Sequence, residues 1–398
     1  MGAHAPVAAL PHPCQGQPLL VVMDTVVKRK VVEVGEMDVA AYSLQRTKDG
    51  CPDAPPWWTQ KACAPCPHSP SCSSSSSSPV AISAAAALRR CHAVDRAALV
   101  AVKTTFNNTS YFASWTPDIP CCAFPSVDCE GSTGRVVGLA ILQDDGVAGP
   151  VPGHAIAGLT RLRSLQLYKL PSVSGAIPAA LTRLSRLLEL TISQAGVSGP
   201  VPSFLGALPE LQSLDLSSNS LTGSIPPSLS ADPNLYSIYL NHNRLVGSIP
   251  PLLFNRAGHL SFLELSHNNL SGSIPADFFA VRFVLIDLSC NRLAGNALVL
   301  FGPGSTELDT VNLSRNALSF DMSRVHLTDR LASLDVSHNR IYGHIPALVA
   351  NLTDLQSFDV GYNRLCGAVP DGAAARFGIH SFEHNRCLCG APLPNPCH

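Results

Sequence analysis

The chain contains 398 residues, of which 46% are hydrophobic and 14% charged, and its formal net charge is −1. This near-neutral balance, with no block of basic residues, argues against nucleic acid as the main partner. No apolar run approaches the roughly 20 residues that a membrane-spanning helix needs, so we expect no membrane span.

Residues 1–90 differ in composition from the rest of the chain. They contain prolines, scattered cysteines and a serine run from Ser73 to Ser78, without a periodicity that would build a core. The stretch CAPCPHSPSC is interrupted by prolines and has no second CxxC partner, so we predict no zinc site there. An alanine-rich run, Ser83–Leu88, is similar to the end of a secretory leader. We expect residues 1–90 to be disordered or absent from the mature protein.

Residues 91–134 are predicted to form an N-terminal cap. From Asp95 to Phe106 the apolar residues Leu99 and Val102 recur at helical spacing, which predicts one short amphipathic helix with an acidic N-cap. The first unit of a repeat array needs such a cap, because its apolar edge would otherwise face water.

Residues 135–370 hold ten copies of one leucine-rich unit. The best copy, LQSLDLSSNSLTGSIP from Leu211 to Pro226, follows the template LxxLxLxxNxLxGxIP. A turn glycine recurs every 23 to 26 residues, and Phe320 replaces it once: Gly149, Gly175, Gly199, Gly223, Gly247, Gly272, Gly295, Gly343 and Gly367. This period predicts an α/β fold, a right-handed leucine-rich repeat solenoid of ten repeats.

Each LxL pair predicts a short strand, and ten such strands predict one concave parallel sheet. The GxIP turn that follows, as in Gly247 to Pro250, predicts short convex strands and one-turn 3-10 segments. Residues 371–398 are predicted to form the C-terminal cap.

An asparagine follows the strand in repeats four to ten: Asn219, Asn243, Asn268, Asn291, Asn316, Asn339 and Asn363. An inward asparagine can pair with buried backbone groups of its own coil and of the next one. We therefore interpret this ladder as structural. The first three repeats lack it, so their turns should be more irregular.

Strand alternation sends one column of residues out onto the concave face: Ala140, Gln166, Thr191, Asp215, Tyr239, Glu264, Asp287, Asn312, Asp335 and Asp359. Five are acids, which favours a basic partner, although the template itself favours Asp here and a merely solvated repeat position is an equal alternative. With the neighbouring columns, the predicted partner-binding residues are Tyr168, Lys169, Thr191, Asp215, Tyr239, His242, Phe262, Glu264, His267, Asp287, Asn312, Arg315 and Asp335.

No cofactor or metal is predicted. His242, His267 and His338 share a column, but only the first two lie in neighbouring repeats, so we expect exposed loop histidines. No nucleotide-binding, metalloprotease or serine-hydrolase motif occurs in residues 91–398. Glu264 and Asp287 could approach the separation of about 5 Å found in retaining glycosidases. Because a flat, exposed sheet offers no pocket to raise a carboxyl pKa, we predict that the protein is not an enzyme.

Cysteines flank the repeats and largely avoid them. Cys91, Cys121, Cys122 and Cys129 precede the repeats, and Cys366, Cys387, Cys389 and Cys397 close the chain. This placement predicts disulfide-stapled caps and an oxidising compartment, whereas Cys290, inside the repeats, is expected to be a free surface thiol. Sequons occur at Asn107, Asn108, Asn269, Asn312 and Asn351. We expect glycans at Asn107, Asn108, Asn269 and Asn351, because a glycan at Asn312 would obstruct the concave face.

The caps carry a family resemblance. The stretch CHAVDRAALVAVKTTF, with ASW at 113–115, CC at 121–122 and VDC at 127–129, resembles the N-terminal cap of plant extracellular leucine-rich repeat proteins. HNRCLCGAPLP, from His384 to Pro394, closely resembles the C-terminal cap of polygalacturonase-inhibiting proteins, as do the ten repeats and the irregular QLYKLPSVSG. The resemblance covers residues 91–398. Phe124 and Pro125, and the few acids in repeats one to three, depart from the pattern.

The resemblance implies a secreted, monomeric protein of the cell wall or apoplast, whose concave face binds endopolygalacturonases of fungi or insects and limits pectin degradation in plant defence. Pectin itself and a receptor are further partners to consider. It also implies four disulfides, Cys91–Cys121, Cys122–Cys129, Cys366–Cys387 and Cys389–Cys397. The alternative is an extracellular signalling protein that regulates development, for example of floral organs, through a peptide or receptor. A complete receptor kinase is not expected, because no span or kinase follows the cap.

Overall fold

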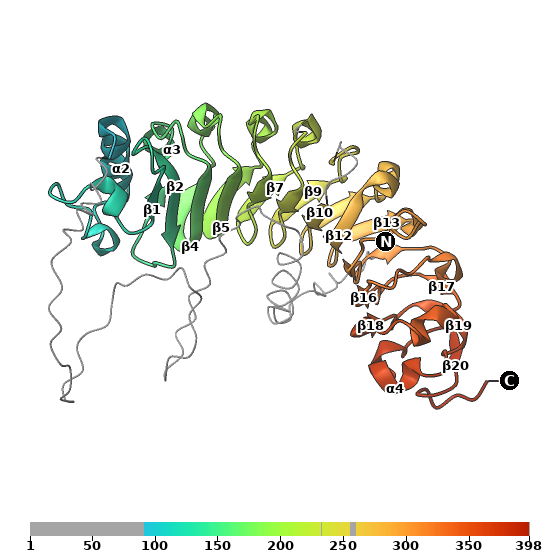
Figure 1. Ribbon diagram of the computed structural model, residues 1–398. Coiled ribbons are helices and arrows are strands. Elements are labelled where there is room, and N and C mark those ends of the chain that lie inside the picture. The colour runs from blue at the N-terminus through green and yellow to red at the C-terminus, as the bar shows by residue number, and fades with distance from the viewer. Residues whose placement is uncertain (1–90, 232, 255–259, 398) are drawn as a thin grey trace, which may run out of the picture. The chain divides into compact units, whose positions relative to one another are not determined.

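The computed structural model describes residues 91–231, 233–254 and 260–397. The expectations for residues 1–90 fall outside these ranges. The described residues form the predicted right-handed leucine-rich repeat solenoid, and Figure 1 shows its coils stacked side by side along a curve.

One strand from each repeat contributes to the concave sheet. These strands are β2 (Val136–Leu142), β4 (Ser164–Gly175), β5 (Glu189–Pro200), β6 (Ser213–Asp215), β8 (Ser237–Tyr239), β10 (Leu260–Glu264), β12 (Arg282–Asp287), β14 (Thr310–Asn312), β16 (Ser333–Asp335) and β18 (Ser357–Asp359). Each pairs in parallel with the next. At the N-terminal edge, β1 (Val127–Cys129) pairs with β2 in the antiparallel sense and covers the open edge.

The GxIP segments form a second series of short strands. They are β3 (Gly149–Pro150), β7 (Ser220–Gly223), β9 (Arg244–Gly247), β11 (Asn269–Gly272), β13 (Arg292–Gly295), β15 (Ala317–Leu318), β17 (Tyr342–Gly343) and β19 (Arg364–Ala368). Helical turns follow on the outer curve: α3 (Gly153–Ile156) and 3-10 turns at Ala179–Arg183, Ser203–Ala207, Pro227–Ala231, Ala276–Ala280, Leu298–Leu300, Met322–Arg324 and Ala347–Ala350. The turn glycines have positive φ, as in Gly247 with φ 82°, which explains why glycine recurs there.

The apolar core runs along the axis of the solenoid. The inward leucines of each LxL pair are fully buried, as in Leu214 and Leu216, while Asp215 between them faces out and is half-buried. Because each coil buries its leucines against the next, burial of about 1.5 to 3 kcal/mol per leucine is available only to a stacked array.

Both caps cover the ends of this core. The N-terminal cap contains α2 (Ala93–Thr105) and 3-10 turns at Ser110–Phe112 and Cys121–Ala123. The C-terminal cap contains α4 (Ala373–Phe377), a 3-10 turn at Ile379–Ser381, and β20 (Cys387–Cys389), which pairs with β19.

The prediction of an acidic N-cap for the first helix was wrong. The N-cap is His92, which makes no side-chain capping bond, and the helix begins before Asp95. The Asp95 carboxylate is fully buried, where it pairs with the guanidinium of Arg135 at 2.8 Å and accepts a hydrogen bond from the backbone N–H of Val136. Asp95 therefore fastens the cap helix to the first strand of the repeats.

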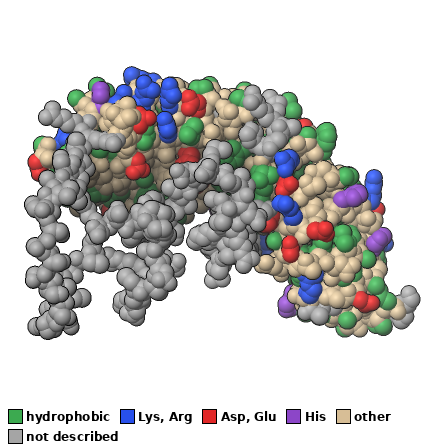
Figure 2. All heavy atoms as spheres, viewed as in Figure 1, with side chains coloured by type: hydrophobic (Ala, Val, Ile, Leu, Met, Phe, Trp, Pro, Cys, Tyr) green, Lys and Arg blue, Asp and Glu red, His purple; other side chains and the backbone are tan. Residues whose placement is uncertain are grey.

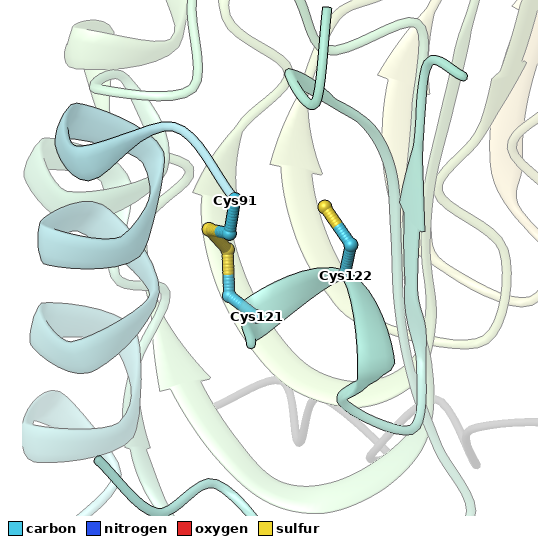
Figure 3. A group of neighbouring side chains, drawn as sticks. All are labelled: Cys91, Cys121 and Cys122. Atoms are coloured by element: carbon cyan, nitrogen blue, oxygen red, sulfur yellow. A yellow bond between two sulfur atoms is a disulfide. The ribbon is translucent and has the colours of Figure 1, made fainter. Parts of the chain in front are cut away.

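Disulfide bonds close both caps. Cys91 is bonded to Cys121, Cys122 to Cys129, Cys366 to Cys387 and Cys389 to Cys397, the pairings that the resemblance implies. In Figure 3 the first of these bonds joins the start of α2 to the Cys121–Ala123 turn, and the Cys122 sulfur lies near this bond without being part of it. Cys290 is also disulfide-bonded, so the expectation of a free thiol was wrong.

The asparagine ladder is structural, as predicted. Asn291 shows the pattern: its Nδ2 donates to the carbonyl oxygens of Leu265, Leu288 and Ser289, and its Oδ1 accepts from the N–H of Leu270. Asn385 continues the ladder into the C-terminal cap, which the sequence analysis missed. Where the ladder is absent, the pairing of β4 with β5 is irregular between Leu170 and Ser174.

Candidate partner-binding site on the concave face

The aspartates of the outward column close the turn at the end of each strand. In these residues Oδ1 accepts a hydrogen bond from the backbone N–H two positions later: Asp215 at 2.9 Å, Asp287 at 2.9 Å, Asn312 at 3.1 Å, Asp335 at 2.9 Å and Asp359 at 2.8 Å. This bond explains why the template favours Asp, and it is satisfied equally by the amide of Asn312. An aspartate here is therefore not by itself a sign of partner binding.

Tyr239 and Glu264 are the two departures from this pattern among repeats four to ten. Neither side chain makes the turn bond, and they face each other across the pairing of β8 with β10. The Glu264 side chain is buried, with 8% of the residue exposed. Burial, followed by the neighbouring charges of Asp287 and Asp215, raises the pKa of Glu264 to about 8. Burial also raises the pKa of Tyr239 to about 12.

The expectation that the sheet could not raise a carboxyl pKa was therefore wrong. Burial raises the pKa values of Asp215, Asp287 and Asp359 as well, although their hydrogen bonds to the following turn act in the opposite direction. The concave face consequently carries less negative charge near neutral pH than its number of acids suggests.

An apolar pair lies beside these acids. Phe262 on β10 is paired in register with Leu285 on β12, and Leu285 is 6% exposed. The register between the two strands shifts at this point, so that Val284 is an extra residue on β12. Such bulges re-aim neighbouring side chains and are common beside functional sites. We call Tyr239, Phe262, Glu264, Leu285 and Asp287 the central concave patch.

A column of stacked side chains borders the patch at the ends of the strands. The rings of His242 and His267 stack at 4.1 Å, and farther along Tyr362 stacks between His338 and His384. These residues have positive φ, with His242 and His267 at 54°. His242 is exposed, whereas His267 and His338 are half-buried, so the expectation of exposed histidines holds only in part.

Burial is the main cause of the lowered pKa values in this column. It lowers the pKa of His267 to about 4, with smaller effects from His242 and Arg315, and it lowers the pKa values of His242 and His338. The imidazoles of His242, His267 and His338 are therefore neutral near pH 7.

The other predicted residues lie farther along the sheet. Tyr168, Lys169 and Thr191 lie on β4 and β5, separated from β10 by β6 and β8. Arg315 and Asp335 lie toward the C-terminal cap, on or beside β14 and β16. The structure thus brings together the predicted residues of repeats five to seven and spreads the others along the sheet.

Asn241 is a further residue of this face that was not predicted from the sequence. It occupies a position that is serine in most neighbouring repeats, and its Oδ1 is buried without a hydrogen-bond partner. An unpaired buried amide oxygen is unusual, because leaving it unpaired costs about 1 to 3 kcal/mol. The break in the serine column was the signal that could have identified it.

Two further features complete the surface. Figure 2 shows Lys and Arg side chains gathered over the N-terminal repeats. Arg161, Arg163, Arg183 and Arg186 belong to these repeats and are exposed. Among the described residues, the one cluster with the spacing of a metal site is Cys91, Cys121 and Cys122. Cys91 and Cys121 are bonded to each other (Figure 3) and Cys122 is bonded to Cys129, so none of the three thiolates is free to bind a metal.

Comparison with known proteins identifies the family. The leucine rich repeat N-terminal domain matches residues 92–130, and the leucine rich repeat model matches residues 210–231, 234–255, 259–280 and 330–352. Polygalacturonase inhibitor 1 of Oryza sativa subsp. japonica is 44% identical over 120 residues, which are 30% of this chain and 36% of that protein. The chain belongs to the plant leucine-rich repeat proteins that resemble polygalacturonase inhibitors. The aligned region spans about a third of the length of this curated relative.

Two solved structures extend the comparison. A plant ice-binding protein is 39% identical with a TM-score of 0.74, and the match covers 78% of this chain and 99% of that one. The ectodomain of the Arabidopsis thaliana receptor kinase GASSHO1/SCHENGEN3, in complex with CASPARIAN STRIP INTEGRITY FACTOR 2, is 28% identical with a TM-score of 0.58. That match covers 65% of this chain and 31% of the ectodomain. None of the helices among the described residues has the length and apolar character needed to cross a bilayer.

Proposed function

We propose that this protein is secreted into the plant cell wall, where its concave face binds endopolygalacturonases of fungi or insects and limits pectin degradation. The observation that carries the proposal is the central concave patch, where the repeat pattern is broken by Tyr239 and Glu264 beside the apolar pair of Phe262 and Leu285. Aromatic and apolar anchors surrounded by polar groups are typical of protein-binding surfaces. The names of the curated relatives supply the partner class.

Inhibition requires no catalysis by this protein, and we propose that it is not an enzyme. A bound protein blocks a polygalacturonase by covering the cleft through which pectin enters. The central concave patch supplies buried anchors, and the acids on either side favour an enzyme surface with positive charge. We further propose that the protein is a monomer with glycans at Asn107, Asn108, Asn269 and Asn351, away from this patch.

The test is an inhibition assay with the full chain produced in a secretory host. Release of reducing ends from polygalacturonic acid is measured with a panel of fungal and insect polygalacturonases, with and without the protein. The proposal predicts lower rates with at least one enzyme. Unchanged rates across the panel would contradict it and would favour the signalling alternative, which the receptor ectodomain match supports.

We also propose that pectin contacts the exposed arginines at the edge of the N-terminal repeats, since guanidinium groups form paired hydrogen bonds with carboxylates. Retention on immobilised polygalacturonate tests this. Replacing Arg161, Arg163, Arg183 and Arg186 with glutamine should abolish the retention at moderate salt.

A second candidate function is control of ice growth. The match that covers 99% of the ice-binding protein favours it. So does the run of small, uncharged, exposed side chains beside the turn glycines, such as Thr222, Ser224, Ser248 and Ser271. Thermal hysteresis and inhibition of ice recrystallisation, measured on the same preparation, decide whether this activity is present.

A further inference from the structure

Among the described residues, the Glu264 side chain is largely covered and accepts no hydrogen bond. Only 8% of the residue is exposed, and no hydrogen bond or ion pair joins its side chain to another described residue. Asp215 and Asp287 in the same column differ, because each accepts an N–H from its own turn. The Glu264 oxygens are not among the buried unpaired atoms of the described residues, so they still reach solvent at the concave surface. A partner that covered this surface would remove that solvent and would have to supply a donor in its place.

The groups that face Glu264 carry no positive charge. Tyr239 on β8 and Asp287 on β12 are its partners in register, and Asp215 on β6 lies close enough to raise its pKa. Asn241, which follows β8, adds a buried amide oxygen without a hydrogen-bond partner. The neighbouring cation is Arg315, beside the stacked histidines. Its charge lowers the pKa values of His267 and His338, and it makes an interaction with another residue.

These acceptors do not have the arrangement of a metal site. Asp215, Glu264 and Asp287 come from different strands, and their carboxylate oxygens do not converge within ligand distance of one another. Separate acceptors spread along a sheet suit an organic cation with several donors, and a guanidinium group has five in one plane.

We infer that Glu264 is the receptor for a single cationic side chain, arginine or lysine, of the protein that binds the concave face. This inference rests on the proposed function for the identity of the partner. The binding of a cationic side chain by Glu264 does not depend on which protein carries that side chain. The aliphatic stem of the incoming residue packs against Phe262 and Leu285, and its head reaches Glu264 and the acceptors beside it.

Cation binding at Glu264 is coupled to loss of a proton. In the free protein the pKa of about 8 keeps this carboxyl largely protonated near pH 7. An adjacent guanidinium favours the carboxylate, so binding expels the proton. The affinity for a cation should therefore rise as pH increases from 6 to 8, by at most about tenfold per pH unit.

The test uses the full chain and two synthetic peptides, a tetra-arginine amide and its uncharged citrulline analogue. Calorimetric titrations at pH 7 in two buffers of different ionisation enthalpy give both the affinity and the number of protons released. The wild type should bind the arginine peptide at least tenfold more tightly than the citrulline peptide and release about one proton. Glu264→Gln should lose at least tenfold in affinity and release none, whereas Asp329→Asn, at an exposed residue outside the concave sheet, should change the affinity less than twofold.

Equal binding of the arginine peptide by the wild type and Glu264→Gln would overturn the inference, as would binding without proton release. An inhibition assay on the same variants separates this result from the proposed function. If the protein inhibits a polygalacturonase but its binding of the arginine peptide does not depend on Glu264, the proposed function stands and the cation site is wrong. If binding of the arginine peptide depends on Glu264 but no enzyme is inhibited, the cation site stands and the proposed function is wrong.

Discussion

Glu264 on β10 lies directly opposite Asp287 on β12, and both carboxylic acids are buried, at 8% and 7% exposure. Burial raises the pKa of both acids, and the charge of Asp287 raises the pKa of Glu264 further. Glu264 on the concave face is therefore largely protonated near neutral pH. The consequences can be measured in stability, in titration and in binding.

Stability should fall with rising pH above neutrality. The folded protein raises the pKa of Glu264 from 4.5 to about 8, so it holds a proton over a range in which the unfolded chain has lost it. Between pH 7 and 8 the histidines, whose pKa values are lowered, are neutral, so the carboxyls dominate. Glu264 contributes at most about 1.4 kcal/mol per pH unit. Urea unfolding at pH 7, 7.5 and 8 should show a smaller decline for Glu264→Gln than for the wild type, and equal declines would contradict this assignment.

The outward aspartates should behave as turn-closing residues. Asp335→Ala removes the acceptor of the Ser337 N–H, so it should cost about 1 kcal/mol of stability. Asp335→Asn keeps the acceptor, as Asn312 does, and should change stability by less than about 0.5 kcal/mol. Urea unfolding of the two variants side by side checks the difference. A similar loss in both would show that the charge, not the turn bond, is what matters.

The stacked histidines should titrate well below their ordinary range. The pKa of His267 is about 4, mainly because of burial and then because of His242. Imidazole NMR signals followed from pH 7.5 to 4 should show His267 still largely neutral at pH 5. In His242→Gln the same pKa should rise only in part, since burial remains. A His267 pKa of 6.5 in the wild type would mean that the stack is solvated.

The asparagine ladder should be the most sensitive part of the repeats. Asn291→Ala leaves the Leu270 N–H and three carbonyl oxygens without their partner, and one unsatisfied buried group costs about 1 to 3 kcal/mol. We expect a loss of at least 2 kcal/mol in urea unfolding. The matched control is Asn296→Ala, which removes one exposed bond to the Leu298 N–H and should cost less than 1 kcal/mol.

The fold followed from the sequence because its signals are local and repeated. The LxL spacing of Leu214 and Leu216, the turn glycines and the asparagines each act within one coil, so ten copies predict ten coils. The N-cap of α2 was missed for the opposite reason. The residues around Asp95 in the sequence suggest a capping residue, but the Asp95 carboxylate pairs with Arg135, forty residues away. A pattern of neighbouring residues cannot predict such a long-range ion pair.

The candidate site could be predicted only in part. Strand alternation placed Tyr239, Phe262 and Glu264 on the concave face correctly. It could not show that Glu264 is buried, because burial depends on the packing of neighbouring strands and on the bulge at Val284. The break in the serine column at Asn241 was visible in the sequence, but its meaning depends on an unpaired oxygen that is recognised only in the folded structure.

The central claim is that the central concave patch binds and inhibits a polygalacturonase. The most direct measurement is the inhibition constant of the double variant Tyr239→Ala/Phe262→Ala against an enzyme that the wild type inhibits. Tyr342→Ala serves as the matched control, since Tyr342 is 47% exposed on β17, outside the concave sheet. We predict at least a tenfold weaker inhibition for the double variant and less than a twofold change for the control. Inhibition by the double variant equal to that of the wild type would contradict the account.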